Sequence, residues 1–239
     1  MCTVTFIARR NGYALGMNRD EQVTRVAGLP PRLRRINGRQ VLFPSEPGGG
    51  TWIALNESKA TFALINWYSV KTRVKGGSVS RGEVVRAVCT AESGAAADRQ
   101  LGNLPLHRIN PFRLIGVFPE SREIIEWRWN LKSLARRERL WGTQQWISSG
   151  YDESTAQLVR GRTFRVAQRQ KSAGTLDWLR RLHRSHAPEC GPFSTCMHRA
   201  DALTVSFTEV VVSGRNGRMR YLAGTPCLKT TETREHIRS

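Results

Sequence analysis

The sequence contains no apolar run long enough to cross a membrane, and it reaches Arg9-Arg10 after a short segment of mixed character. A spanning helix needs about 20 consecutive apolar residues, and a secretory signal needs an uninterrupted apolar segment. The cysteines are few, odd in number and irregularly spaced, which argues against a disulfide framework. They are Cys2, Cys89, Cys190, Cys196 and Cys227. We therefore predict a cytoplasmic protein without a membrane span.

Lysine is also scarce: the formal net charge is +19, yet only six of the 38 basic residues are lysine. The arginines are scattered from Arg9 to Arg238 and form no long basic block. No zinc finger, aromatic-basic ribonucleoprotein signature or basic leucine zipper accompanies them, which disfavours nucleic acid as the main ligand. The charge predicts attraction of a small anionic ligand, and the alternative is that these residues form solvated faces. The sequence leaves the oligomeric state open.

The 239 residues, 39% of them hydrophobic, fit one domain over residues 1–239. The patterns predict strands, helices, strands, helices and strands in turn, which is typical of an α+β fold built on antiparallel sheet. Strands are expected at 51–55, 61–67, 112–118, 123–129, 203–213 and 219–222, and helices at 81–91, 95–104, 154–168 and 175–186. Residues 29–31 and 43–50 are expected to be loops, and 141–149 strand or loop. Ser80 and Glu83 match a capping box at a helix start.

The first residues predict a β-hairpin. Residues 2–8 alternate as a strand, Asn11-Gly12 is a preferred pair for a two-residue turn, and a second strand should run from Tyr13 to about Glu21. A loop centred on Asn11-Gly12 places Arg19 opposite Val4, on the face of Cys2, whereas Asp20 points to the other face. A slip of one residue would exchange these faces.

Cys2 is a candidate nucleophile. Removal of Met1 would leave the thiol and a free α-amine on one residue, and an α-amine has a reference pKa near 8, so it can act as a base toward the thiol. A nearby arginine would favour the thiolate. The alternative is that Cys2 is only a half-buried strand residue.

Several short motifs together resemble those of the NRDE family, the group that includes the transport and Golgi organisation proteins. They are Met1-Cys2, residues 18–21 (NRDE), residues 49–55 (GGTWIAL), residues 80–83 (SRGE), residues 110–112 (NPF) and residues 196–199 (CMHR). The resemblance implies a four-layered αββα fold of the N-terminal-nucleophile hydrolases, similar to the choloylglycine hydrolase and penicillin V acylase group. Those enzymes hydrolyse non-peptide amides.

The resemblance also implies roles for individual residues. Cys2 matches the nucleophile, Asp20 matches an aspartate of the acylase strand, and Arg19 stands two positions after the acylase arginine, which preserves its face. Asn66, in Leu64-Ile65-Asn66-Trp67, resembles the acylase asparagine that helps to form the oxyanion hole. The predicted function is an N-terminal cysteine amidohydrolase for a small non-peptide amide.

Two positions depart from the acylase pattern. Residues 148–150 (SSG) stand where the acylases carry a further asparagine, and residues 204–207 (TVSF) stand where they carry a late arginine. A retained hairpin with altered outer positions fits either a different substrate or a pocket that binds without turnover. The alternative function is therefore a non-enzymatic binding or trafficking protein for haem or another anionic small molecule.

A group of histidines and cysteines lies near the C-terminal end: His183, His186, Cys190, Cys196 and His198. Their gaps match no common zinc pattern, and Cys-x-His needs a turn to place both side chains on one ion. We expect local packing and hydrogen bonding rather than a metal, and no cofactor. The family has been linked to haem trafficking, and His and Cys can be axial haem ligands, but no Cys-x-x-Cys-His attachment motif is present.

Overall fold

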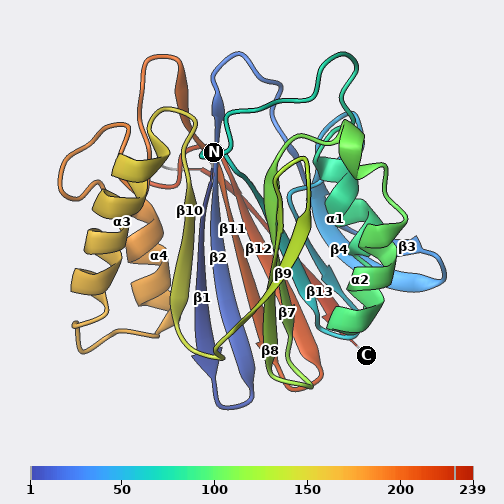
Figure 1. The fold of residues 1–239 in the computed structure, drawn as a ribbon. Helices are drawn as coiled ribbons and strands as arrows, with labels where there is room; N and C mark the ends of the chain where they lie inside the picture. The colour runs from blue at the N-terminus through green and yellow to red at the C-terminus, as the bar shows by residue number, and fades with distance from the viewer. Residues whose placement is uncertain (1, 229, 239) are drawn as a thin grey trace.

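The computed structural model describes residues 2–228 and 230–238, which form two antiparallel sheets packed face to face with helices on both outer faces (Figure 1). The first sheet has the order β10-β1-β2-β11-β12-β13. Its strands are β1 (Cys2–Arg9), β2 (Gly12–Gln22), β10 (Gln144–Ser148), β11 (Ala202–Ser213), β12 (Asn216–Ala223) and β13 (Thr231–Arg238). β1 therefore lies inside the sheet, paired on both sides.

The second sheet has the order β3-β4-β5-β6-β7-β8-β9. Its strands are β3 (Leu29–Ile36), β4 (Arg39–Ser45), β5 (Ile53–Asn56), β6 (Thr61–Asn66), β7 (Phe112–Phe118), β8 (Glu123–Trp129) and β9 (Leu134–Arg139). The expected strands at 112–118 and 123–129 are confirmed to the residue. Those at 51–55, 61–67, 203–213 and 219–222 are confirmed with shifts at their ends.

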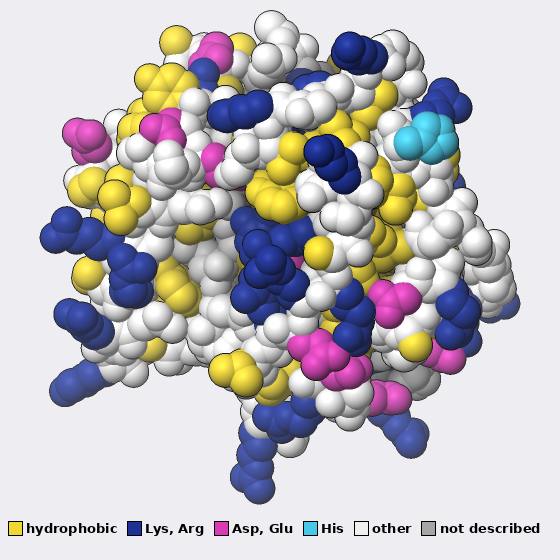
Figure 2. Space-filling model, in the orientation of Figure 1, with side chains coloured by type: hydrophobic (Ala, Val, Ile, Leu, Met, Phe, Trp, Pro, Cys, Tyr) yellow, Lys and Arg dark blue, Asp and Glu magenta, His cyan; other side chains and the backbone are white. Residues whose placement is uncertain are grey.

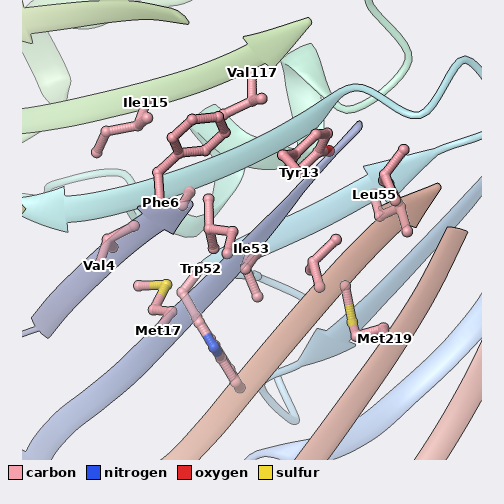
Figure 3. Close-up of a cluster of buried hydrophobic side chains, with 14 of the residues drawn as sticks. Val4, Phe6, Tyr13, Met17, Trp52, Ile53, Leu55, Ile115, Val117 and Met219 are labelled. Carbon is pink, nitrogen blue, oxygen red and sulfur yellow. The ribbon is translucent and has the colours of Figure 1, made fainter. Parts of the chain in front are cut away.

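The main core fills the space between the sheets, where alternate residues of each strand meet (Figure 3). Val4, Phe6 and Met17 come from the first sheet, and Ile53 and Ile115 from the second. All five side chains are fully buried. The strand alternation that predicted the hairpin thus places the face of Cys2 toward the second sheet.

Helices cover both outer faces, as Figure 1 shows. They are α1 (Gly82–Val88) and α2 (Gly94–Gly102) on the second sheet, and α3 (Glu153–Ala167) and α4 (Leu176–Arg184) on the first, with a short 3-10 turn η1 (Leu106–Arg108). The side chains of Ser93, Asp152 and Thr175 cap α2, α3 and α4 by accepting a backbone N–H. The predicted αββα layering and α+β class are confirmed.

The register of the N-terminal hairpin differs from the prediction by two residues. Arg9 pairs with Gly12, so the loop is Arg10-Asn11 rather than Asn11-Gly12, and Cys2 lies directly opposite Arg19. Gly12 has a φ of +136°, which only glycine adopts readily. Because the shift is even, the predicted faces survive: Cys2 and Arg19 share one, and Asp20 lies on the other.

Some predictions were wrong. Residues 29–31 and 43–45 belong to strands β3 and β4 rather than to loops, and strands β9 and β13 were not predicted. The capping box does not form, because the Ser80 hydroxyl accepts from the N–H of Gly82 at 3.2 Å and α1 begins without a side-chain cap. α1 is also shorter than expected and ends at Val88.

Basic side chains are more numerous than acidic ones, 38 against 19 in the sequence. Figure 2 shows basic side chains spread over the visible face, with acidic side chains among them. Within the described part of the chain, no helix has the length and apolar character needed to cross a bilayer.

Candidate active site

A cavity of about 330 Å³ opens beside the start of β1 and lies within the size range of small-ligand sites. Its lining includes all four residues predicted from the sequence: Cys2, Arg19, Asp20 and Asn66. The separate motifs at 18–21, 49–55, 80–83 and 110–112 each contribute lining residues. The hairpin, the glycine-rich loop and the start of α1 thus meet at one place.

Cys2 is held from both sides in the sheet. It pairs with Arg19 of β2 and with Ser148 of β10, and its backbone nitrogen donates to the Ser148 hydroxyl at 3.2 Å. Ser148 belongs to the segment that stands in place of the acylase asparagine. The predicted removal of Met1 concerns a residue outside the described ranges.

The Cys2 side chain is only 7% exposed. Burial raises the pKa of its thiol, and the charge of Arg19 acts in the opposite direction. The thiol is therefore mainly protonated at neutral pH, so nucleophilic attack by Cys2 requires a base.

Arg19 sits in a charge cluster at the cavity wall. Its guanidinium lies 2.6 Å from Glu46 and 3.5 Å from Glu21, and it stacks over the Trp52 ring at 4.5 Å. Arg25 joins both carboxylates, at 3.1 Å from Glu21 and 2.8 Å from Glu46. Both arginines are thus already compensated by acidic partners. The sequence indicated Arg19 through the strand face but gave no sign of Glu46, which lies on a loop.

Asp20 faces away from the thiol side of the hairpin, toward α3. Its carboxylate forms an ion pair with Arg160 at 3.1 Å and accepts from the Thr204 hydroxyl at 2.7 Å. Arg160 also donates to the Thr3 hydroxyl at 2.8 Å. Asp20, Arg160 and Thr204 are fully buried. Asp20 therefore joins β2 to α3 and β11.

Sequence reasoning missed Arg160, although one signal was available. Ala156, Arg160 and Phe164 recur every four residues and form the buried face of α3. An arginine in such an apolar stripe requires a buried carboxylate partner, because an unpaired charge would be costly there.

Asn66 ends β6 at the cavity and is half-buried. Its side-chain nitrogen donates to the Tyr68 hydroxyl at 2.8 Å, which leaves its second N–H available. The following segment is anchored to α3, because the backbone N–H groups of Tyr68 and Ser69 donate to the Glu153 carboxylate at 3.4 and 2.5 Å. Asn66 thus lines the cavity at the start of a segment that is held in place by α3.

Arg81 also lines the cavity and was not singled out from the sequence. Its guanidinium donates to the carbonyl oxygen of Pro111 at 3.4 Å, and among the described residues no carboxylate lies within ion-pair distance of it. Burial lowers the pKa of Arg81, yet an arginine stays protonated in proteins. Arg81 thus lines the cavity as a cation without an acidic partner in the described part of the chain.

A glycine contact closes the wall near Arg81. A β-carbon on Gly82 would lie 2.8 Å from the α-carbon of Gly50 and 2.9 Å from the nitrogen of Thr51. The two backbones can approach this closely because Gly82 carries no side chain, whereas a β-carbon on Gly50 would lie at an ordinary 3.4 Å from the α-carbon of Gly82. This contact brings the Gly-Gly-Thr and Ser-Arg-Gly-Glu motifs together in the folded chain.

Asn18 and His183 form a second buried connection on the outer face of β2. The Asn18 amide donates to the carbonyl oxygens of His183 and Thr195 at 2.9 and 2.8 Å, and the His183 ring nitrogens lie 3.0 Å from Asn18 and 3.0 Å from the Thr5 hydroxyl. Burial, together with Arg160, lowers the pKa of His183 to about 3. His183 is therefore a neutral core residue.

The predicted histidine and cysteine group separates in the structure. His183 is in the core and Cys190 is exposed. His186, Cys196 and His198 lie together, and they are joined by Cys227, which follows β12 and was not included from the sequence. These four are the described residues whose side chains converge with metal-binding atoms.

A sequence model of the family described as Transport and Golgi organisation 2 matches residues 1–164. No curated protein matches the chain. A conjugated bile acid hydrolase from Clostridium perfringens, as an arginine-to-leucine variant, superposes with a TM-score of 0.59 at 10% identity, covering 98% of this chain and 92% of that one. The penicillin V acylase from Agrobacterium tumefaciens gives 0.57 at 9% identity, covering 98% and 85%.

A cysteine-to-alanine variant of the same Clostridium perfringens hydrolase gives a TM-score of 0.56 at 10% identity and covers 98% of this chain and 92% of that one. At these identities the likeness shows the fold alone, which is that of the N-terminal-nucleophile hydrolases.

Proposed function

The chain belongs to the Transport and Golgi organisation 2 family, and from this and the cavity at Cys2 we propose that it is an N-terminal cysteine amidohydrolase. Its substrate is a small, non-peptide amide that carries an anionic group. The observation that carries the proposal is the position of Cys2, a buried residue that lines a ligand-sized cavity and whose backbone nitrogen donates to Ser148.

The reaction begins when the sulfur of Cys2 attacks the amide carbonyl carbon. After Met1 is removed, the α-amine of Cys2 takes the thiol proton and passes it to the leaving nitrogen, so the C–N bond breaks and a thioester forms. Water then attacks the thioester carbon, releasing a carboxylic acid and restoring the thiol. The hydrogen bond to Ser148 would orient the α-amine.

The other residues act around this centre. Asn66 donates its remaining N–H to the developing oxyanion, an interaction worth about 3 kcal/mol in related chemistry. Arg19 stabilises the thiolate from the opposite strand position, and Asp20 is a positioning residue that fixes β2 from behind. Arg81 binds the anionic group of the substrate, since it forms no ion pair with any residue that the structure describes.

The second candidate is a protein that binds haem or another anionic small molecule without turnover. It is supported by Arg81 and by the raised pKa of the buried Cys2 thiol, which favours the unreactive form. Both candidates use the same cavity, so they differ only in whether the bound molecule is hydrolysed.

Substitution Cys2→Ala separates the candidates. We expect hydrolysis of the best substrate from a panel of N-acyl amino acids, monitored by amine release, to fall by about a thousandfold or more, because the attacking atom is gone. Binding, measured by thermal shift, should persist. The matched control is Cys190→Ser, which alters an exposed cysteine outside the cavity and should leave turnover unchanged.

Intact mass of the purified chain tests the mechanism directly. We expect the mass of the protein without Met1, because only then is the α-amine carried by Cys2. A retained Met1, or a Cys2→Ala protein with full turnover, contradicts the hydrolase proposal. Binding of the anionic amides with no turnover by the wild type supports the second candidate.

A further inference from the structure

Four potential metal ligands from two connections of the chain converge beside the first sheet. His186 follows α4, Cys196 and His198 lie in the connection from α4 to β11, and Cys227 follows β12. Their ligand atoms all lie within 4.8 Å of one another. This set is separate from the cavity at Cys2, whose lining contains none of the four.

The distances match a tetrahedral arrangement. The Nε2 atom of His198 lies 3.2 Å from Nε2 of His186, 3.7 Å from Sγ of Cys196 and 3.4 Å from Sγ of Cys227. Zinc bonds of about 2.3 Å to sulfur and about 2.0 Å to nitrogen place neighbouring ligand atoms about 3.3 to 3.8 Å apart. The edges around His198 therefore fit one central ion.

Hydrogen bonding alone does not account for these contacts. A ring nitrogen carries either one hydrogen or one lone pair, so Nε2 of His198 can satisfy at most one of its three neighbours. A cation at the centre would bond to all four atoms at once. We propose that His186, Cys196, His198 and Cys227 bind a structural zinc ion.

The ligand chemistry selects the metal. Two thiolates and two imidazoles form the Cys2His2 set of closed, four-coordinate zinc sites, whereas magnesium and calcium prefer oxygen ligands. With all four positions taken by protein, no position remains for a substrate or a water molecule. The site is therefore structural rather than catalytic.

The backbone around the ligands is already held in place. The N–H of Cys196 donates to the carbonyl oxygen of Ser185 at 3.0 Å, and that of His198 donates to Gly191 at 3.2 Å. The chain bends at Cys196, which supplies the turn that Cys-x-His requires to direct both side chains to one ion. The ligands are thus preorganised, so little ordering remains to oppose metal binding.

The site also supports the N-terminal hairpin. Met197, between two of the ligands, donates its N–H to the Thr204 hydroxyl at 2.8 Å, and that hydroxyl donates to Asp20 at 2.7 Å. Thr195 accepts from the Asn18 amide at 2.8 Å. A zinc ion would fix this connection and, through it, the outer face of β2.

Metal analysis of the full-length chain, prepared without an affinity tag, tests the proposal. We expect about one zinc ion per chain by inductively coupled plasma mass spectrometry after dialysis against metal-free buffer. Replacement by cobalt should give the visible absorption bands of a tetrahedral, thiolate-ligated Co²⁺. Removal of the metal by a chelator should lower the melting temperature, because metal binding contributes to folding.

Variants locate the site. Cys227→Ser and His186→Ala should each lower the zinc content by about tenfold or more and abolish the cobalt bands. Cys190→Ser, a cysteine between two of the ligands in sequence but outside the cluster, should keep both. Circular dichroism checks that the variants are folded.

Three results would overturn the proposal. The first is a wild-type chain with less than about a tenth of a zinc ion that also gives no cobalt bands. The second is a stoichiometric metal other than zinc. The third is a disulfide between Cys196 and Cys227, detected by peptide mass mapping without reduction, because a disulfide removes both thiolates.

Discussion

The two faces of the N-terminal hairpin have opposite kinds of polar contact. On the outer face, Asn18 and Asp20 are fully buried and bonded to the α4 connection, α3 and β11. On the inner face, Cys2 and Arg19 border a cavity in which Arg81 has no acidic partner among the described residues. Adjacent residues of β2 thus have different roles: Asn18 and Asp20 hold the strand to its neighbours, whereas Arg19 borders a cavity that can accept a ligand.

The largest effect is expected from removing the ion pair between Asp20 and Arg160 on the outer face of the hairpin. Asp20→Asn should lower the free energy of unfolding by about 3–5 kcal/mol, because it leaves the buried Arg160 charge without a carboxylate. Urea unfolding measures the loss. The control is Asp201→Asn, which breaks the Arg199 pair at the surface and should cost about 1 kcal/mol or less. If Asp20→Asn and Asp201→Asn lowered the free energy of unfolding equally, the buried pair on the outer face would have no special role in stability.

The second test uses pH. The pKa of His183 is about 3 in the folded chain against an ordinary value of 6.5, so the folded state binds fewer protons than the unfolded state. Its contribution to stability is complete above pH 6.5 and declines as the pH falls toward 3, by about 1.4 kcal/mol per pH unit.

Substitution His183→Gln isolates this contribution. The difference in unfolding free energy between wild type and His183→Gln should shrink as the pH is lowered from about 7 to about 4. The exposed His107→Gln serves as the control and should give a constant difference. Parallel curves for wild type and His183→Gln would show that His183 is not held neutral by the core.

The smallest effect concerns the cavity. Arg81→Gln should weaken binding of a small carboxylate such as benzoate by about tenfold, as expected for loss of one charged hydrogen bond, with little change in stability. Isothermal titration calorimetry gives the affinity. Arg25→Gln is the matched control, because Arg25 lines the same cavity but is already paired with Glu21 and Glu46. A larger effect at Arg25 would contradict the role given to Arg81.

The strands that could best be predicted from the sequence are those that are largely buried. The hairpin and the strands β7 and β8 were found because their residues are β-branched or aromatic and bounded by turn residues. The hairpin register was wrong by two residues, because Gly12 ends the loop instead of occupying its centre. Because the register shifted by two residues, Cys2 and Arg19 still lie on the same face, as predicted.

Of the four strands that were missed, three lie at sheet edges, and the fourth, β4, lies inside the second sheet beside β3. β3, β9 and β13 each end a sheet and are largely exposed, so no apolar alternation marks them. β3 also contains Pro30 and Pro31, which signal a loop in most contexts but are tolerated on an edge strand. Local pattern therefore could not distinguish these strands from loops.

The site residues on the hairpin could be predicted from the sequence, whereas those from distant segments could not. Cys2, Arg19 and Asp20 could be placed because one hairpin fixes their positions, and the structure brings Asn66 to the same cavity. Arg160, Arg81 and Cys227 come from segments distant in sequence, and only the folded chain shows what they contact. Spacing in the sequence can mark such a residue as buried, as for Arg160, but it does not identify the partner.

The arginines on the edge strands have a consequence for how separate molecules meet. β3 exposes Arg32, Arg34 and Arg35, β9 exposes Arg137, and β13 exposes Arg238. Two copies that approached edge to edge would bring these like charges together before any backbone hydrogen bond could form. Part of the high positive charge thus opposes the growth of a continuous sheet through neighbouring molecules, independently of any ligand.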